Sequence, residues 1–207
     1  QATLPGLNAA TTITRDANGT VTIDAQNASD ALRALGYVHA QERFFEMDLM
    51  RRSAAGELSA LFGAIALDVD KQHRLHRLRA RVQQQLPQIA GEKRPQLDAY
   101  VAGVNAGLNA LHARPWPYLL LREAPQPWRA EDTPLAAFAM YFDLQGGENT
   151  SELALWRIRP HLPPALYALL TRDGTRWDAL LQGTARGDAV LPGAEQVNLR
   201  TLPGDPV

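Results

Sequence analysis

Three carboxylates surround a short polar turn in the second half of the chain, within the segment YFDLQGGENTSE. They are Asp143, Glu148 and Glu152. Together with Asn149, they offer the oxygen ligands that a hard cation such as calcium prefers. The same segment also fits a helix start, with Thr150 or Ser151 as the N-cap and Glu152 in the first turn. The spacing alone leaves both a cation site and a helix cap open.

The ordinary catalytic signatures are missing from the sequence. The chain has no cysteine, which excludes a thiolate nucleophile, a thiolate metal site and a disulfide. It contains no His-Glu-x-x-His, no Gly-x-Ser-x-Gly and no glycine-rich phosphate loop. His73 and His76 are close enough to share a helix face, but a metal pair would need further ligands that the sequence does not indicate. We therefore interpret the two histidines as part of a solvated helix face.

Aromatic and charged side chains are densely mixed in residues 36–52, GYVHAQERFFEMDLMRR. Because large side chains surround this helix on all sides, some of its ions must be partly buried, and a buried ion needs a partner. The candidates are Glu42, Glu46 and Asp48 facing Arg43, Arg51 and Arg52. We interpret them as a structural ion network rather than as a catalytic site.

Bulk charge does not select a partner for this chain. Its 207 residues carry a net charge of -1, which creates no long-range field favouring nucleic acid or an anionic membrane. The basic stretch at residues 71–81 has Leu75 and Leu78 at helical spacing and no interleaved aromatic residue for base stacking. No apolar run approaches the length of a membrane span. Neither nucleic acid nor a membrane is expected as a partner.

The elements that must position these residues are mostly helices. A hairpin is expected around Asn18-Gly19, because Val21 and Ile23 alternate with polar residues after that turn signal. Ser29 is the expected N-cap of a first helix that runs to Gly63, with a break into two helices allowed at residues 55–56. A content of 45% hydrophobic residues is sufficient for a real core.

Later helices are expected at residues 71–86, 95–108, 133–142, 152–158 and 164–170. Pro87 should end the first of these and Pro160 the fourth. Five prolines between residues 115 and 134 predict a rigid, irregular connection. Residues 135–142 form the most apolar stretch of the chain and should be deeply buried.

Several segments of this sequence resemble the α chain of penicillin acylase-type N-terminal nucleophile (Ntn) amidohydrolases. The opening match is residues 36–52 followed by AGEL at residues 55–58. Similar segments follow in the family's order: DAYVAGVNA at 98–106, YLL at 118–120, PWRAED at 127–132 and TSE at 150–152. The resemblance implies an α+β fold, namely the mostly helical α chain of a four-layer αββα heterodimer. It divides the chain into a short hairpin that joins the β-chain sheet (1–27), a helical part (28–182) and an extended C-terminal tail (183–207).

The same resemblance implies that the chemistry is carried by a partner chain. Such enzymes are exported precursors that cut themselves and free a β chain whose N-terminal serine is the nucleophile. No catalytic residue is then expected in this chain, and the implied location is periplasmic or secreted, with a signal peptide removed before Gln1. The implied partners are this β subunit and an acylated small molecule. No organic cofactor is implied, but Glu152 would hold a structural calcium ion together with β-chain carboxylates.

One wall of the acyl pocket would also lie on this chain. By the resemblance it consists of Met140, Phe142, Leu144, Gln145 and Gly146. Penicillin G acylases carry an arginine and then a phenylalanine in this region, whereas this chain has LQGG at residues 144–147, which indicates a roomier slot for an aliphatic acyl chain. The expected function is hydrolysis of the amide bond of N-acyl-homoserine lactones, with penicillins as a second substrate class. A penicillin G or cephalosporin acylase and a non-catalytic helical scaffold are the alternatives.

Overall fold

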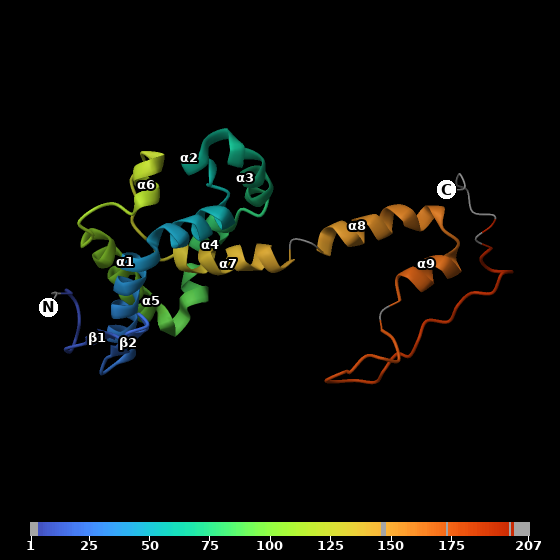
Figure 1. Cartoon of the computed structure of the whole chain (residues 1–207), viewed down its shortest axis with the longest axis horizontal. Helices are drawn as coiled ribbons and strands as arrows, with labels where there is room; N and C mark the ends of the chain where they lie inside the picture. Colours follow the sequence, from blue (N-terminus) through green and yellow to red (C-terminus); the bar gives the residue numbers. More distant parts are fainter. Residues whose placement is uncertain (1–3, 146–147, 173, 199, 201–207) are drawn as a thin grey trace. The chain divides into compact units, whose positions relative to one another are not determined.

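The computed structural model describes residues 4–145, 148–172, 174–198 and 200. The chain forms two compact units, residues 1–144 and 145–207. Most of the described residues are helical, and a single short hairpin lies near the N-terminus of the described chain (Figure 1). The predicted mostly helical chain with an N-terminal β-hairpin is therefore confirmed.

The hairpin pairs β1 (Thr12–Arg15) with β2 (Val21–Asp24) in antiparallel register. Its turn is closed by Asp16, whose carboxylate accepts backbone N–H groups from Asn18 at 2.9 Å and Thr20 at 2.8 Å. Gly19 has a φ of 81°, a conformation that side chains disfavour and glycine adopts freely. The turn signal in the sequence thus located the hairpin correctly.

The first helix, α1 (Ala28–Ala55), begins and ends at other residues than predicted. Asn27, not Ser29, is the N-cap, because its side-chain oxygen accepts the backbone N–H of Asp30 at 2.9 Å. The helix does not continue to Gly63. Gly56 adopts the left-handed conformation and donates its N–H to the carbonyls of Arg52 and Ser53, which ends the helix. The allowed break at residues 55–56 is the one that occurs.

Helices α1 and α5 (Arg94–Asn109) pack against each other with almost no space between their backbones. A Cβ atom added at Gly36 would collide with the backbone oxygen of Tyr100, and one added at Gly103 with the backbone oxygen of Arg33. Glycine is therefore required by close approach at this crossing. The core beside it is formed by the buried side chains of Ala40, Phe44, Met47, Leu61, Val104, Tyr118 and Trp128.

The region after α1 is divided into more pieces than predicted. It contains α2 (Ser59–Phe62), η1 (Gly63–Ala66), α3 (Leu67–Arg74), α4 (Leu78–Ala90) and η2 (Gly91–Lys93). The single helix expected at residues 71–86 is interrupted because Arg77 has a φ of 52°. Pro87 does not end α4, which continues to Ala90. Gln83 and Pro87 are exposed, so water can satisfy the carbonyl that loses its helical partner.

The proline-rich connection contains a helix, α6 (Trp116–Leu121), and is therefore not wholly irregular. Pro117 lies in its first turn, where a missing N–H costs little. Helix α7 (Asp132–Gln145) follows. Within its apolar stretch only Leu135 is fully buried, whereas Met140 and Tyr141 are 58% and 57% exposed. The prediction of deep burial is wrong for the second half of this helix.

The second unit contains α8 (Glu148–Ile158), η3 (Arg159–His161) and α9 (Pro164–Leu170). The predicted helix at residues 152–158 thus begins earlier, while the one at residues 164–170 has its predicted bounds. Large apolar side chains are exposed here too, among them Trp156 at 69%. No helix in the described residues is long and apolar enough to span a membrane.

Candidate functional site

Helix α7 presents an exposed apolar face near its C-terminal end. Met140 and Leu144 are one helical turn apart, so they lie on the same face, and they are 58% and 68% exposed. Both belong to the predicted acyl-pocket wall. Large apolar side chains gathered on one face, rather than scattered singly, mark a surface that binds something.

Phe142, predicted for the same wall, lies on a different side of α7. Its half-buried ring stacks on His73 of α3, with ring centroids 4.4 Å apart and planes inclined by 10°. His76 also contacts this ring, at 4.9 Å. His73 is half-buried, and its Nδ1 lies 2.6 Å from the carbonyl oxygen of Ser53. The interpretation of both histidines as a solvated face is therefore wrong for His73, because α7 packs over it.

The remaining residues of the predicted wall are Gln145 and Gly146. Gln145 is the last residue of α7, and Gly146 is outside the described residues. The structure thus brings Met140 and Leu144 together on one face and places Phe142 on another. Their assignment to an acyl pocket stays a prediction.

Glu152, the predicted calcium ligand, is an exposed residue inside α8. Thr150 and Ser151 also lie within this helix, which begins at Glu148, so the alternative interpretation of either as an N-cap is wrong. Among the described residues no group of three or more His, Asp or Glu side chains could hold a metal ion. Calcium needs six to eight oxygen ligands, so these residues alone do not form its site.

The charged residues of α1 form a buried ion network with residues from later in the chain. Asp48 and Asp132 are fully buried, and Arg51 between them is 4% exposed. Arg51 donates from Nε to Asp48 at 2.7 Å and from Nη1 to Asp132 at 2.6 Å. It also donates to the backbone carbonyls of Gln126 and Pro127, both at 2.9 Å. Arg51 therefore joins α1 to the segment that leads into α7.

Other ions extend this network on both sides. Arg52 donates to Asp48 at 2.9 Å. Arg79 of α4 donates to Asp132 at 2.9 Å and holds both oxygens of Glu57 at 2.6 and 2.7 Å. Three arginines thus meet three carboxylates, and the ions of the network balance. In the described part of the chain, no buried side-chain nitrogen or oxygen lacks a hydrogen-bond partner.

Tyr118 completes the network from α6. Its hydroxyl donates to the second oxygen of Asp48 at 2.6 Å. Burial, followed by the hydrogen bond to the Asp48 carboxylate, raises the pKa of Tyr118 well above its ordinary value, so the phenol stays protonated. Burial by itself lowers the pKa of Arg79, but its hydrogen bonds to Glu57 and Asp132 more than offset this and raise it. These two raised pKa values keep the Tyr118 phenol and the Arg79 guanidinium protonated, which suits a structural role rather than proton transfer.

The sequence indicated only part of this network. Asp48, Arg51 and Arg52 were among the predicted ions. Glu46 is exposed, and Glu42 lies outside the buried network, where it pairs with the predicted Arg43 at 3.9 Å and also with Arg15 of the hairpin. Tyr118, Arg79 and Asp132 were missed as partners. The sequence signal that includes two of them is the matched segments YLL and PWRAED, which begin with Tyr118 and end with Asp132.

An apolar groove of about 820 Å³ lies between α1, α4, α5 and α7. Its polar centre is a pair, His39 and Tyr100, with Nδ1 of His39 3.0 Å from the tyrosine hydroxyl. Burial, and after it the nearby Arg43, lowers the pKa of His39, so the imidazole is neutral at pH 7. Tyr141 of α7 also lines this groove.

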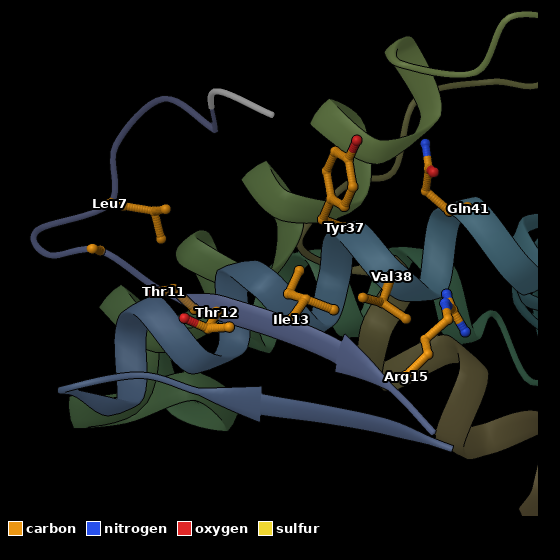
Figure 2. Close-up of a pocket in the computed structure, with 9 residues that line it drawn as sticks. Leu7, Thr11, Thr12, Ile13, Arg15, Tyr37, Val38 and Gln41 are labelled. Carbon is orange, nitrogen blue, oxygen red and sulfur yellow. The ribbon is translucent and has the colours of Figure 1, made fainter. Parts of the chain in front are cut away.

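A second groove, of about 690 Å³, runs between the hairpin and α1. Figure 2 shows Leu7 at one end and Arg15 at the other, with Ile13 and Val38 between them. Arg15 pairs with Glu42, and the amide of Gln41 donates to the backbone oxygen of Gly107 at 3.1 Å. The hydroxyl of Tyr100 is paired with the imidazole of His39 in the first groove, but burial raises the pKa of Tyr100, so this pair is not an activated nucleophile.

Comparison with known proteins gives consistent matches. A family model described as penicillin amidase matches residues 10–193. Penicillin acylase 2 proenzyme from Pseudomonas sp. strain SE83 is 40% identical over 125 residues, which cover 60% of this chain and 16% of that protein. Acyl-homoserine lactone acylase QuiP from Pseudomonas putida is 34% identical over 157 residues, covering 73% of this chain and 19% of that protein. The chain therefore spans less than a fifth of the length of these curated relatives.

A solved structure matches the fold. A thermostable penicillin G acylase from Alcaligenes faecalis superposes with a TM-score of 0.69 at 24% sequence identity. The match covers 85% of this chain and 98% of that chain. At this identity the likeness concerns the fold alone.

Proposed function

The chain belongs to the penicillin amidase family, and on this premise we propose that it is the α subunit of an amidohydrolase that cleaves N-acyl-homoserine lactones. The observation that carries the proposal is the exposed apolar face of Met140 and Leu144, in a chain where the Tyr100 hydroxyl beside His39 has a raised pKa and is not an activated nucleophile. In a site shared by two chains, one chain would supply a pocket wall and the other would supply the catalytic groups. One relative is named a proenzyme, which supports processing of a longer precursor.

In the proposed reaction, the N-terminal serine of the β chain attacks the amide carbonyl. Its own α-amino group, with a pKa of about 8, accepts the hydroxyl proton through water. The C–N bond then breaks, the amine leaves with that proton, and water hydrolyses the acyl ester to the free acid. Met140 and Leu144 would take no part in these steps. They would bind the acyl chain and exclude water from it.

The lactone assignment rests on the residues that follow α7. Small residues in LQGG leave space for an aliphatic chain, and a lactone acylase is among the relatives. A penicillin or cephalosporin acylase remains the second candidate, because the relative named penicillin acylase 2 proenzyme is 40% identical. The two candidates share the reaction, hydrolysis of an amide bond, and differ in the acyl group and in the amine that leaves.

The hairpin is the proposed attachment point for the β chain. In the described residues β1 pairs only with β2, and all four of its residues are exposed. An edge strand of this kind can pair with a strand of another chain. The groove in Figure 2 lies beside it and would receive apolar side chains of the β subunit.

Expression of the full precursor gives the direct test. We expect the purified enzyme to contain a second, larger polypeptide that begins with serine. It should hydrolyse a long-chain N-acyl-homoserine lactone faster than penicillin G. A preference for phenylacetyl substrates would replace the lactone assignment by the second candidate. Activity or stable monomeric behaviour of the present chain alone would contradict the subunit proposal itself.

Calcium and location are separate parts of the proposal. Glu152 would contribute one ligand, and β-chain carboxylates the others, to a structural ion. Elemental analysis of the assembled enzyme should find calcium in the wild type and less of it in Glu152→Gln; equal content in both would remove Glu152 from the site. Cell fractionation should recover the enzyme in the periplasm or the medium, and recovery from the cytoplasm would contradict export.

A further inference from the structure

The second half of α7 has few contacts that could hold it in place. Met140, Tyr141, Asp143 and Leu144 are all exposed. Phe142 is the half-buried side chain nearest the C-terminal end of this helix among those that the structure describes. Its environment therefore controls where the preceding and following turns lie.

Phe142 meets a ring that is itself fixed. His73 lies parallel to it with ring centroids 4.4 Å apart, a stacked arrangement that stabilises a pair of aromatic rings beyond the burial of their area. Because a carbonyl oxygen only accepts hydrogen bonds, Nδ1 of His73 carries a proton and donates it to Ser53 at 2.6 Å. The carbonyl of Ser53 lies in the last turn of α1, which the buried ion network anchors. A continuous series of contacts thus connects the rigid end of α1 to Phe142.

We propose that His73 is a positioning residue for the acyl-binding face of α7. Its ring fixes Phe142, and Phe142 fixes the helical turns that carry Met140 and Leu144. The proposal rests on the proposed function, since it assigns those two residues to the acyl pocket. His73 acts on them through Phe142.

The test compares variants of the full processed enzyme on lactones of long and short acyl chains. His73→Ala removes the ring, so we expect KM for the preferred long-chain lactone to rise about threefold to tenfold, as loss of an aromatic contact implies. The kcat value and the rates for short chains should change little. His73→Phe keeps a ring that can stack and should restore the long-chain KM. His112→Ala, at an exposed histidine elsewhere in the first unit, is the matched control.

Two results would overturn the proposal. One is an equal loss on all chain lengths accompanied by a lower melting temperature, which is what a merely structural role predicts. The other is no change in the ratio of long-chain to short-chain kcat/KM. If the wild type hydrolyses no acylated substrate, the proposed function fails instead. Hydrogen exchange then decides the positioning role: His73→Ala should speed amide exchange in residues 139–144 and His73→Phe should not, and unchanged exchange in both would overturn it.

Discussion

The two ends of α7 differ in how many of their side chains find partners within this chain. At the first end, Asp132 is fully buried and accepts hydrogen bonds from Arg51, Arg79 and the backbone of Arg129. At the other end, Leu144 is an apolar side chain that is 68% exposed. One helix thus passes from a region where every polar atom is paired to one where apolar surface meets water. At the first end, the buried polar groups are paired within this chain. At the second end, the apolar surface lacks a cover, and another molecule would have to supply it.

The largest expected effect comes from disrupting the buried ion network at the N-terminal end of α7. Arg51→Leu would leave the buried carboxylates of Asp48 and Asp132 with only Arg52 and Arg79 as cationic partners, so the network would lack one positive charge and unfolding should become easier by about 3–5 kcal/mol. Chemical denaturation of the assembled enzyme measures this change. Arg94→Ala, which removes an exposed pair with Asp98, is the control and should cost at most about 1 kcal/mol. Similar losses in the two variants would mean that the network is not the anchor.

A smaller effect, on activity rather than on stability, is expected at the exposed C-terminal end of α7. Leu144→Asn puts an amide where the acyl chain would lie, so transition-state binding should weaken by about 1–3 kcal/mol. The denaturation midpoint should stay nearly unchanged, because the side chain is exposed in this chain. Measured kcat/KM on a long-chain lactone tests the first expectation. Leu120→Asn on α6, also highly exposed, is the control; a comparable loss of activity there would mean that Leu144 has no special place.

The smallest expected effect is on the pH dependence of stability. It comes from His39, which lines the apolar groove between α1, α4, α5 and α7. Because burial and Arg43 lower the pKa of His39, the unfolded chain binds more protons just below its ordinary value of about 6.5. The stability that neutral His39 provides is therefore present above that value and is lost as the pH falls below it. Denaturation midpoints across this range should fall less steeply in His39→Gln than in the wild type. A steeper fall in the variant would show that Glu42, which opposes the shift, dominates instead.

Local features of the fold were predictable because neighbouring residues determine them. Asn18 and Gly19 located the hairpin turn, and α9 (Pro164–Leu170) has the bounds expected from the sequence. Helix ends were less predictable. Asn27 and Ser29 are both good N-caps, and only the hydrogen bond to Asp30 distinguishes them.

Long-range features were not predictable in the same way. That some ions of the first helix are buried followed from the large side chains around it, but nothing near Asp48 and Arg51 in sequence pointed to Tyr118 or Arg79. The apolar residues 135–142 show a second reason why sequence-based prediction falls short. Hydropathy indicates that Met140 avoids water, but it does not say whether the same chain or another one covers it.

The position of the buried ion network in the sequence also determines when it can form during synthesis. All of its side chains lie between Asp48 and Asp132, before the residues assigned to substrate and metal. Since domains fold as they leave the ribosome, from the N-terminus onward, the network can close while later residues are still being made. In the proposed precursor, a finished scaffold would then hold the apolar face of α7 ready for the β chain as that chain emerges.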